Sequence, residues 1–170
     1  MAQINPKETA QRTIALEADA IKNLSALLTE DFNKVVDIVM TAKGRLIVSG
    51  IGKSAVIAQK IVATLNSTGT PSVFMHAADA IHGDLGMILN YDVVMIISKS
   101  GESPEIKVLV QLIKNFGNKV IGIVGNIDSY LAKQSDFVLN TTVSQEACPN
   151  NLAPTSSTTA QMVMGDALAV

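Results

Sequence analysis

The sequence predicts an α/β fold, namely a doubly wound, mainly parallel five-stranded sheet with helices on both faces, preceded by two N-terminal helices. After residue 45, short apolar runs rich in β-branched residues alternate with stretches of helical period, which is typical of parallel sheets with right-handed crossovers. The apolar runs are nearly continuous, as in strands that helices cover on both faces. At 170 residues the chain fits one domain of ordinary size.

Two amphipathic helices are expected before the first strand. Asn5 is a good N-cap and Pro6 suits the first helical position, and apolar residues then recur at spacings of three and four as far as Leu28. A second helix is expected from about residue 31 to 43, with Gly44 ending it.

The rest of the chain alternates strands with helices. Strands are expected at 46–48, 72–75, 93–97, 120–124 and 137–139. Helices are expected at about 53–67, 77–83, 104–116, 128–134 and 155–170. Thr155 or Ser156 is expected to cap the last helix, which reaches Val170 without a closing residue and suggests that the natural chain continues or that this is a selected part. Ligands of such sheets gather at the carboxyl ends of the strands.

The composition argues against several classes of function. The formal charge is -2 and no run of Lys or Arg occurs, so the sequence lacks the cluster of basic residues that nucleic-acid binding requires. No apolar run of about 18 residues and no signal peptide are found, and the single cysteine, Cys148, fits a reducing compartment. We therefore expect a cytoplasmic protein without a membrane partner. With 48% apolar and 16% charged residues, part of the apolar surface is expected to form subunit contacts.

A glycine loop, Gly-Ile-Gly-Lys-Ser at residues 50–54, joins the first strand to the next helix. Its glycines let the backbone approach a ligand, and Lys53 lies at the helix start. A dinucleotide fingerprint would need an acidic residue at the end of the second strand, but the nearest is Asp79. A Walker A loop would need a glycine where Ile47 stands. The remaining alternative to ligand binding is a tight turn with a solvated lysine.

A serine loop, Ser-Lys-Ser-Gly-Glu-Ser at residues 98–103, follows the third strand directly and leads into a helix. Ser103 can cap this helix and Pro104 suits its first position. The hydroxyls of Ser98 and Ser100, together with the free N–H groups of the helix start, form a nest for a dianionic phosphate. An ordinary polar loop would explain the cap but not the density of hydroxyls, so the loop predicts a phosphate site.

The two histidines, His76 and His82, lie six residues apart. This spacing differs from that of a helical metal pair, so metal catalysis is not indicated. His76 ends the second strand and His82 precedes a Gly-Asp turn, so both can face the same cleft, although a structural role for either stays open.

Together these motifs resemble the sugar isomerase (SIS) domain of arabinose 5-phosphate isomerases, over nearly the whole chain. The likeness rests on residues 50–54, 68–71, 82–87, 98–103, 146–149, 153–160 and 164–168. The resemblance implies one SIS domain over residues 1–170 that interconverts D-ribulose 5-phosphate and D-arabinose 5-phosphate, a reaction that supplies the Kdo of lipopolysaccharide. It also implies a homotetramer, a phosphosugar as the only partner molecule, and no cofactor.

The resemblance also implies the residues of the site. The expected catalytic residues are Lys53, His82, Glu105 and Glu146. The expected substrate- and phosphate-binding residues are Gly50, Gly52, Ser54, Gly69, Thr70, Ser98, Ser100, Gly101, Glu102 and Ser103. His76 matches a position at which some relatives bind an inhibitory zinc ion. Many relatives carry two regulatory CBS domains after the SIS domain, which this sequence lacks, and a further active-site histidine is expected beyond its last residue.

Aldose–ketose isomerisation needs a base that moves a proton between C1 and C2 and a group that stabilises the enediolate oxygen, but no redox cofactor. Glu105 or Glu146 is expected to be the base, with Glu102 as a competitor. Lys53 and His82 are expected to polarise the carbonyl or to help open the sugar ring. Two alternatives stay open, namely a non-catalytic sugar-phosphate sensor and an isomerase of another phosphosugar. The roughly 44 residues before the first strand are not basic and do not resemble a helix-turn-helix.

Overall fold

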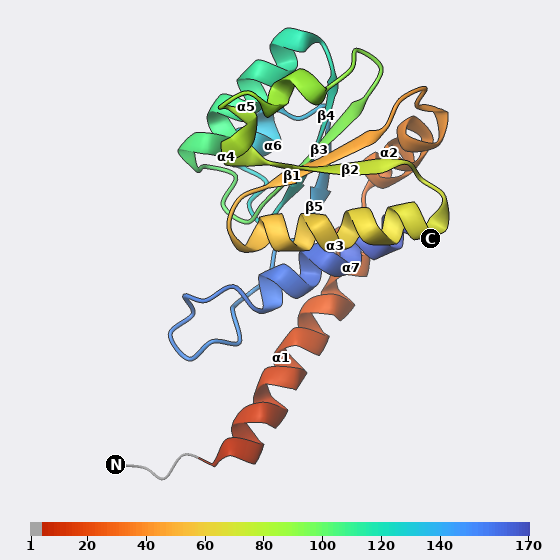
Figure 1. The fold of residues 1–170 in the computed structure, drawn as a ribbon. Coiled ribbons are helices and arrows are strands. Elements are labelled where there is room, and N and C mark those ends of the chain that lie inside the picture. The colour runs from red at the N-terminus through yellow and green to blue at the C-terminus, as the bar shows by residue number, and fades with distance from the viewer. Residues whose placement is uncertain (1–4) are drawn as a thin grey trace.

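The computed structural model describes residues 5–170, in which a central sheet lies between two layers of helices (Figure 1). The helices are α1 (Pro6–Leu27), α2 (Glu30–Thr41), α3 (Lys53–Thr68), α4 (Ala77–Ala80), α5 (Pro104–Phe116), α6 (Tyr130–Gln134) and α7 (Ser156–Ala169), with a 3-10 turn η1 at Asp84–Met87. The strands are β1 (Leu46–Gly50), β2 (Ser72–His76), β3 (Val93–Ser98), β4 (Lys119–Val124) and β5 (Phe137–Asn140). Residues 1–4 of the expected domain lie outside the described residues. Within the described part of the chain, no helix is long and apolar enough to cross a membrane.

All neighbouring strands pair in parallel, in the order β2-β1-β3-β4-β5. The predicted doubly wound sheet of five strands is therefore confirmed. From β1 the chain passes to β2 on one side and then crosses to β3 on the other, so the strand order reverses between β1 and β3. In open α/β sheets this switch point leaves a crevice beyond the carboxyl ends of the two strands, where ligands bind.

Alternating residues of the strands bury themselves in two separate cores. Val48 and Met95 face the core that α3 and α7 cover, whereas Ile47 and Ile96 face the core under α5 and α6. All four side chains are fully buried. Burial on both faces is the reason that the strands read as continuous apolar runs in the sequence.

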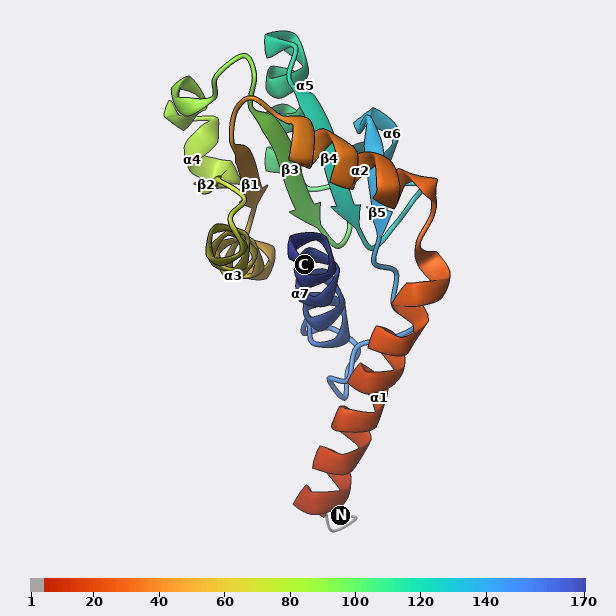
Figure 2. The same ribbon diagram turned by 90° about the vertical axis from the view of Figure 1, so that its right-hand side faces the viewer.

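The expected N-terminal helices are present. The Asn5 side chain accepts the backbone N–H groups of Lys7 and Glu8, which confirms the predicted cap of α1. Both views show the first half of α1 standing clear of the sheet and its covering helices (Figures 1 and 2). α2 ends two residues earlier than predicted, and Gly44 does not cap it. Instead a Cβ at Gly44 would lie 2.6 Å from the carbonyl oxygen of Tyr91, so the glycine permits a close backbone approach.

Two predicted helices are shorter than expected. α4 ends at Ala80, because Gly83 adopts a φ of +137° and directs the chain into η1. Residues other than glycine avoid this region of φ. The helix expected from residue 128 begins at Tyr130, since the hydroxyl oxygen of Ser129 accepts the N–H of Ala132 and caps α6 there.

The contact between α3 and α7 gives a first prediction. Gly165 of α7 lies against Ile61 of α3, and a Cβ at position 165 would overlap the Ile61 side chain, which is fully buried. We expect Gly165→Ala to lower the free energy of unfolding by about 1–3 kcal/mol, although alanine favours helices more than glycine does. Urea denaturation followed by circular dichroism measures the change.

The exposed Ala167 of the same helix offers a control, because Ala167→Leu should change stability by less than about 0.5 kcal/mol. Adding Ile61→Val to Gly165→Ala removes Cδ1, one of the two Ile61 carbons that overlap, and should recover part of the loss. A Gly165→Ala variant more stable than the parent would contradict this packing of α3 on α7.

Candidate active site

The glycine loop and the serine loop flank the switch point of the sheet. The glycine loop leaves β1 at Gly50, the serine loop leaves β3 at Ser98, and Gly50 pairs in register with Ile97. Both loops therefore leave neighbouring strands at the same level. The fold places the two predicted ligand loops side by side at the carboxyl edge of the sheet, where a ligand of such a fold binds.

The serine loop is folded tightly by its own hydroxyls. The Ser98 Oγ accepts the N–H of Gly101 at 3.0 Å, and the Ser100 Oγ accepts the N–H of Glu102 at 3.3 Å. Gly101 has a φ of +64°, and a Cβ there would overlap the Ser129 side chain, so only glycine fits. Because the two serine oxygens act as acceptors, their hydroxyl hydrogens remain free to donate to an anion.

Ser103 occupies the N-cap position of α5 but does not make the predicted capping bond. Its Oγ atom is buried, and none of residues 5–170 forms a hydrogen bond with it. Pro104 takes the first helical position, as expected. A buried hydroxyl without a partner costs about 1–3 kcal/mol. Helix N-termini bind anions, so an unpartnered hydroxyl at the start of α5 favours an anion-binding site there.

Glu102 turns away from the serine hydroxyls and ties the loop to α6. Its carboxylate accepts the N–H of Tyr130 at 2.6 Å and pairs with the Lys107 ammonium at 2.6 Å. The hydrogen bond from Lys107 and the bond from the Tyr130 N–H lower the pKa of Glu102. Nothing in this arrangement brings Glu102 to a bound phosphate.

Two positions of the glycine loop require glycine, Gly50 because of a close contact and Gly52 because of its backbone angle. A Cβ at Gly50 would lie 2.9 Å from the carbonyl carbon of Ser54, and Gly52 has a φ of +58°. Lys53, the first residue of α3, is exposed and has no hydrogen-bond or ion-pair partner among the described residues. The Ser54 hydroxyl donates to the Oε1 of Gln161 at 3.2 Å, which joins α3 to α7. The loop thus offers an uncommitted ammonium next to the crevice.

Glu146 is a buried carboxylate with several donors. The residue is 2% exposed and lies between β5 and α7. Its oxygens accept hydrogen bonds from Lys99 Nζ at 2.6 Å, from the Thr155 N–H at 2.8 Å and hydroxyl at 3.1 Å, and from the Ser157 N–H at 3.1 Å and its hydroxyl.

The cap of α7 is this carboxylate and not a hydroxyl of Thr155 or Ser156, so the predicted cap is wrong. Thr155 lies at the N-cap position but makes no side-chain cap bond, and it donates its hydroxyl to Glu146 instead. A full negative charge interacts more favourably with the N-terminus of a helix than a neutral hydroxyl does.

The donors around Glu146 decide its protonation. Burial alone would raise the pKa, but the hydrogen bonds from Lys99, Ser157 and Thr155 outweigh burial and lower the pKa of Glu146 to about 2. A general base works best when its pKa lies near the operating pH. The Glu146 carboxylate is therefore a weak proton acceptor in this arrangement.

Glu105 has a contrasting environment. It lies in the first turn of α5, directly after the serine loop, and is half-buried. Within residues 5–170 no group donates a hydrogen bond to its carboxylate and no cation pairs with it. Its oxygens are free to accept a proton from a substrate held by the serine loop.

The two histidines follow β2 at the other side of the crevice. His76 ends β2, its Nδ1 is buried without a hydrogen bond, and that atom lies 3.8 Å from the nearest Asp79 carboxylate oxygen. His82 is exposed in the turn after α4. The described residues contain no group of three or more His, Cys, Asp or Glu side chains that could hold a metal. A zinc ion at His76 therefore stays a prediction.

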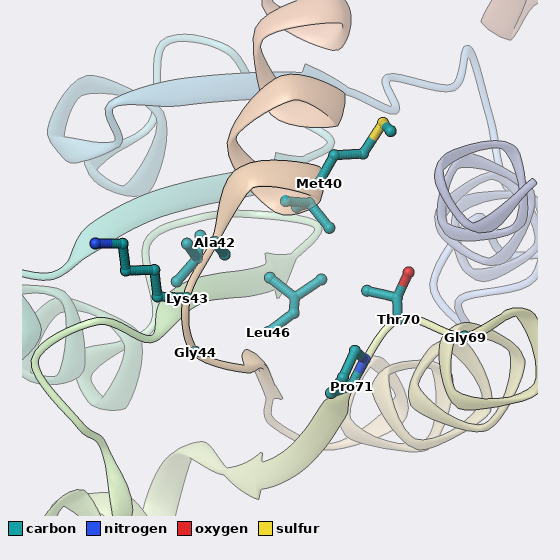
Figure 3. Close-up of a pocket in the computed structure, with 10 residues that line it drawn as sticks. Met40, Ala42, Lys43, Gly44, Leu46, Gly69, Thr70 and Pro71 are labelled. Atoms are coloured by element: carbon teal, nitrogen blue, oxygen red, sulfur yellow. The ribbon is translucent and has the colours of Figure 1, made fainter.

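The structure does not bring Gly69 and Thr70 to the serine loop. Gly69 is the left-handed C-cap of α3, and both residues precede β2, whereas the other predicted ligands follow their strands. The two residues line a hollow of about 400 Å³ that also includes Lys43, Leu46 and Pro71, at the amino edge of the sheet (Figure 3). Within one chain the topology separates them from the expected phosphate site, because the two edges of a parallel sheet face opposite ways.

Sequence reasoning missed Lys99, Ser157 and Gln161, which contact two of the predicted site residues, Glu146 and Ser54. Lys99 and Ser157 bind Glu146, and Gln161 binds Ser54. The position of Lys99 between two loop serines was the one signal in the sequence that could have indicated its involvement.

Comparison with known proteins identifies the family of this chain. The SIS domain family matches residues 39–170. An arabinose 5-phosphate isomerase of Pseudomonas aeruginosa is 52% identical over 162 residues, which are 95% of this chain and 50% of that protein. One of Escherichia coli O6:H1 is 51% identical over 163 residues, again 95% of this chain and 50% of that protein. This chain spans about half the length of these curated relatives.

A solved structure of a protein of Escherichia coli CFT073 in complex with arabinose 5-phosphate is also similar. It superposes with a TM-score of 0.92 at 36% sequence identity, and the match covers 98% of this chain and 90% of that one. The two proteins therefore share one fold over nearly all of this chain.

Proposed function

Because the chain belongs to the SIS domain family, we propose that it acts as an aldose–ketose isomerase that interconverts D-ribulose 5-phosphate and D-arabinose 5-phosphate. One observation carries the chemistry, namely the serine loop at the switch point, with the unpartnered Ser103 hydroxyl at the start of α5. The substrate follows from the curated relatives, which are named for this reaction. The product would feed the synthesis of Kdo.

The serine loop supplies the binding energy in this proposal. The hydroxyl hydrogens of Ser98, Ser100 and Ser103 and the free N–H groups of the first turn of α5 donate to the phosphate. The glycines at positions 50 and 52 let the β1 loop lie close to the sugar. The phosphate end is held at β3, and the carbon chain extends toward β1.

Glu105 is the proposed base, because its carboxylate is free while that of Glu146 is held by five donors. It removes the proton from C2 of the aldose, and the C2–H electron pair forms the C1–C2 double bond of an enediolate with its charge on the C1 oxygen. A proton passes from the C2 hydroxyl to the C1 oxygen, and the same group returns its proton to C1 as C2 becomes the carbonyl of the ketose. The uncommitted ammonium of Lys53 stabilises the enediolate oxygen. His82 is proposed to help open the sugar ring.

The test is direct. The protein is incubated with ribulose 5-phosphate and, separately, with arabinose 5-phosphate in the presence of a chelator, and the two sugars are separated and quantified. We expect both reactions to reach the same equilibrium mixture. Ser103→Ala should raise KM by about tenfold, since the hydroxyl donates to a charged group. Turnover of six- or seven-carbon sugars alone, or phosphosugar binding without turnover, would contradict the proposed substrate or the proposed catalysis.

We also propose that the protein is a homotetramer in the cytoplasm. Large apolar side chains are exposed on the projecting helix and at the edge of the fold, with Ile14 69% exposed and Met40 80% exposed. Such residues commonly lie in subunit interfaces. Light scattering after gel filtration should report four chains, and Ile14→Glu should reduce that number. A parent protein that elutes as one chain would contradict the assembly.

A further inference from the structure

Lys99 is the residue of the serine loop that reaches across to the start of α7. Its Nζ atom lies 2.6 Å from Oε1 of Glu146, which is 47 positions away in the sequence. The Glu146 side chain is fully buried, while that of Lys99 is 45% exposed. Among the five donors to this carboxylate, Lys99 is the only charged one. The ion pair therefore joins the serine loop to the segment that precedes α7.

The backbone of Lys99 makes a second contact, with the residue that follows β4. The Lys99 carbonyl oxygen accepts the N–H of Gly125 at 3.1 Å, just after β4. A Cβ at Gly125 would lie 2.9 Å from that same oxygen and 3.2 Å from the Cγ of Lys99, so only glycine allows the approach. The end of β4 thus supports the base of the lysine side chain, and Glu146 holds its tip.

We propose that Lys99 is a positioning residue. Its ion pair with Glu146 holds the serine loop against the N-terminus of α7. Phosphate binding therefore depends on Lys99 and Glu146 together. The inference rests on the proposed function only for the identity of the phosphosugar. It differs from a role for Lys99 as a direct ligand of the phosphate.

The contacts favour positioning over direct ligation. If the ammonium moved to a phosphate, the buried Glu146 carboxylate would lose its only charged partner, and a buried charge without a partner is strongly destabilising. The phosphate nest has its own donors in the serine hydroxyls and the start of α5. Lys99 is thus needed at Glu146 and is not required to neutralise the ligand.

A double-mutant cycle tests the proposal. Lys99→Met, Glu146→Gln and the double variant are compared by calorimetric binding of inorganic phosphate and of arabinose 5-phosphate. We expect Lys99→Met to weaken both affinities by about tenfold in the parent, but by less than about twofold in the Glu146→Gln background. Lys99→Arg should restore most of the affinity. Lys114→Met, which removes a charge from the last turn of α5, serves as the control and should change neither affinity.

Equal losses from Lys99→Met in both backgrounds would overturn the proposal, because they would show a direct contact with the phosphate. An unchanged affinity in Lys99→Met would overturn it as well. Inorganic phosphate binds without turnover, so an absent isomerase activity would leave the phosphate result intact. Conversely, an active protein in which the effects of Lys99→Met and Glu146→Gln on affinity are independent would contradict the positioning role and leave the proposed function intact.

Hydrogen exchange provides a second readout if the Glu146 variant folds poorly. The N–H of Gly125 donates to the Lys99 carbonyl, so it should lose protection in Lys99→Met, where the tip of the side chain is no longer held by Glu146. Unchanged exchange at Gly125 in Lys99→Met would overturn the proposal.

Discussion

Glu105→Gln is expected to lower kcat for the interconversion of ribulose 5-phosphate and arabinose 5-phosphate by a factor of about 10²–10⁴, with little change in KM. The glutamine keeps the shape of the side chain at the start of α5 but cannot accept the proton from the carbon. Because binding is assigned to the serine loop, ground-state affinity should remain. Initial rates over a range of substrate concentrations separate the two parameters.

Glu102 offers a matched control for the effect of Glu105→Gln on kcat. Glu102 is anchored to α6 by Tyr130 and Lys107, so Glu102→Gln should change kcat by no more than about threefold. In deuterated water the parent should incorporate deuterium at the reacting carbons, and Glu105→Gln should lose this exchange along with turnover. A Glu105→Gln enzyme with near-normal turnover would remove Glu105 from the role of base.

The fold followed from local patterns, and this is why most of it could be predicted. The central strands β1, β3 and β4 are buried on both faces, so their apolar runs are visible in any short window of the sequence. Asn5 and Pro6 mark the start of α1 within two residues. Errors occurred at the ends of helices, where a single residue decides the boundary. The positive φ at Gly83 ends α4 early, and a glycine alone does not say whether it ends a helix or allows a close approach, as Gly44 does.

The candidate site was only partly visible in the sequence, because its contacts join distant segments. The serine loop is contiguous, so its hydroxyls and the helix start could be read directly. The surroundings of Glu146 could not, since its partners lie 47 positions before it and 9 to 11 positions after it, and only the folded chain brings them together. Glu105 and Glu146, between which the sequence could not choose the base, differ in these long-range contacts.

Glu146→Gln is expected to lower the free energy of unfolding by about 3 kcal/mol at pH 7, the second large effect that the structure predicts. The carboxylate caps α7 and pairs with Lys99, and the amide can replace neither the charge nor all of the acceptor positions. The pKa of Glu146 falls from 4.5 to about 2 on folding. The native state therefore binds fewer protons than the unfolded state at acidic pH, and the ionised group stabilises the native state. This contribution is complete above about pH 4.5 and is lost as the pH falls through about 2.

Urea denaturation of the parent and of Glu146→Gln at pH 7 and at pH 3 measures this dependence. The difference between the two proteins should be largest at pH 7 and clearly smaller at pH 3, where the parent begins to lose the ionic contribution. Asp37→Asn, an exposed change on α2, should alter stability by less than about 0.5 kcal/mol at either pH. If the loss in Glu146→Gln were the same at both pH values, the stabilisation would come from shape and neutral hydrogen bonds. The low pKa, and with it the argument that Glu146 is too weak a base and leaves proton transfer to Glu105, would then be wrong.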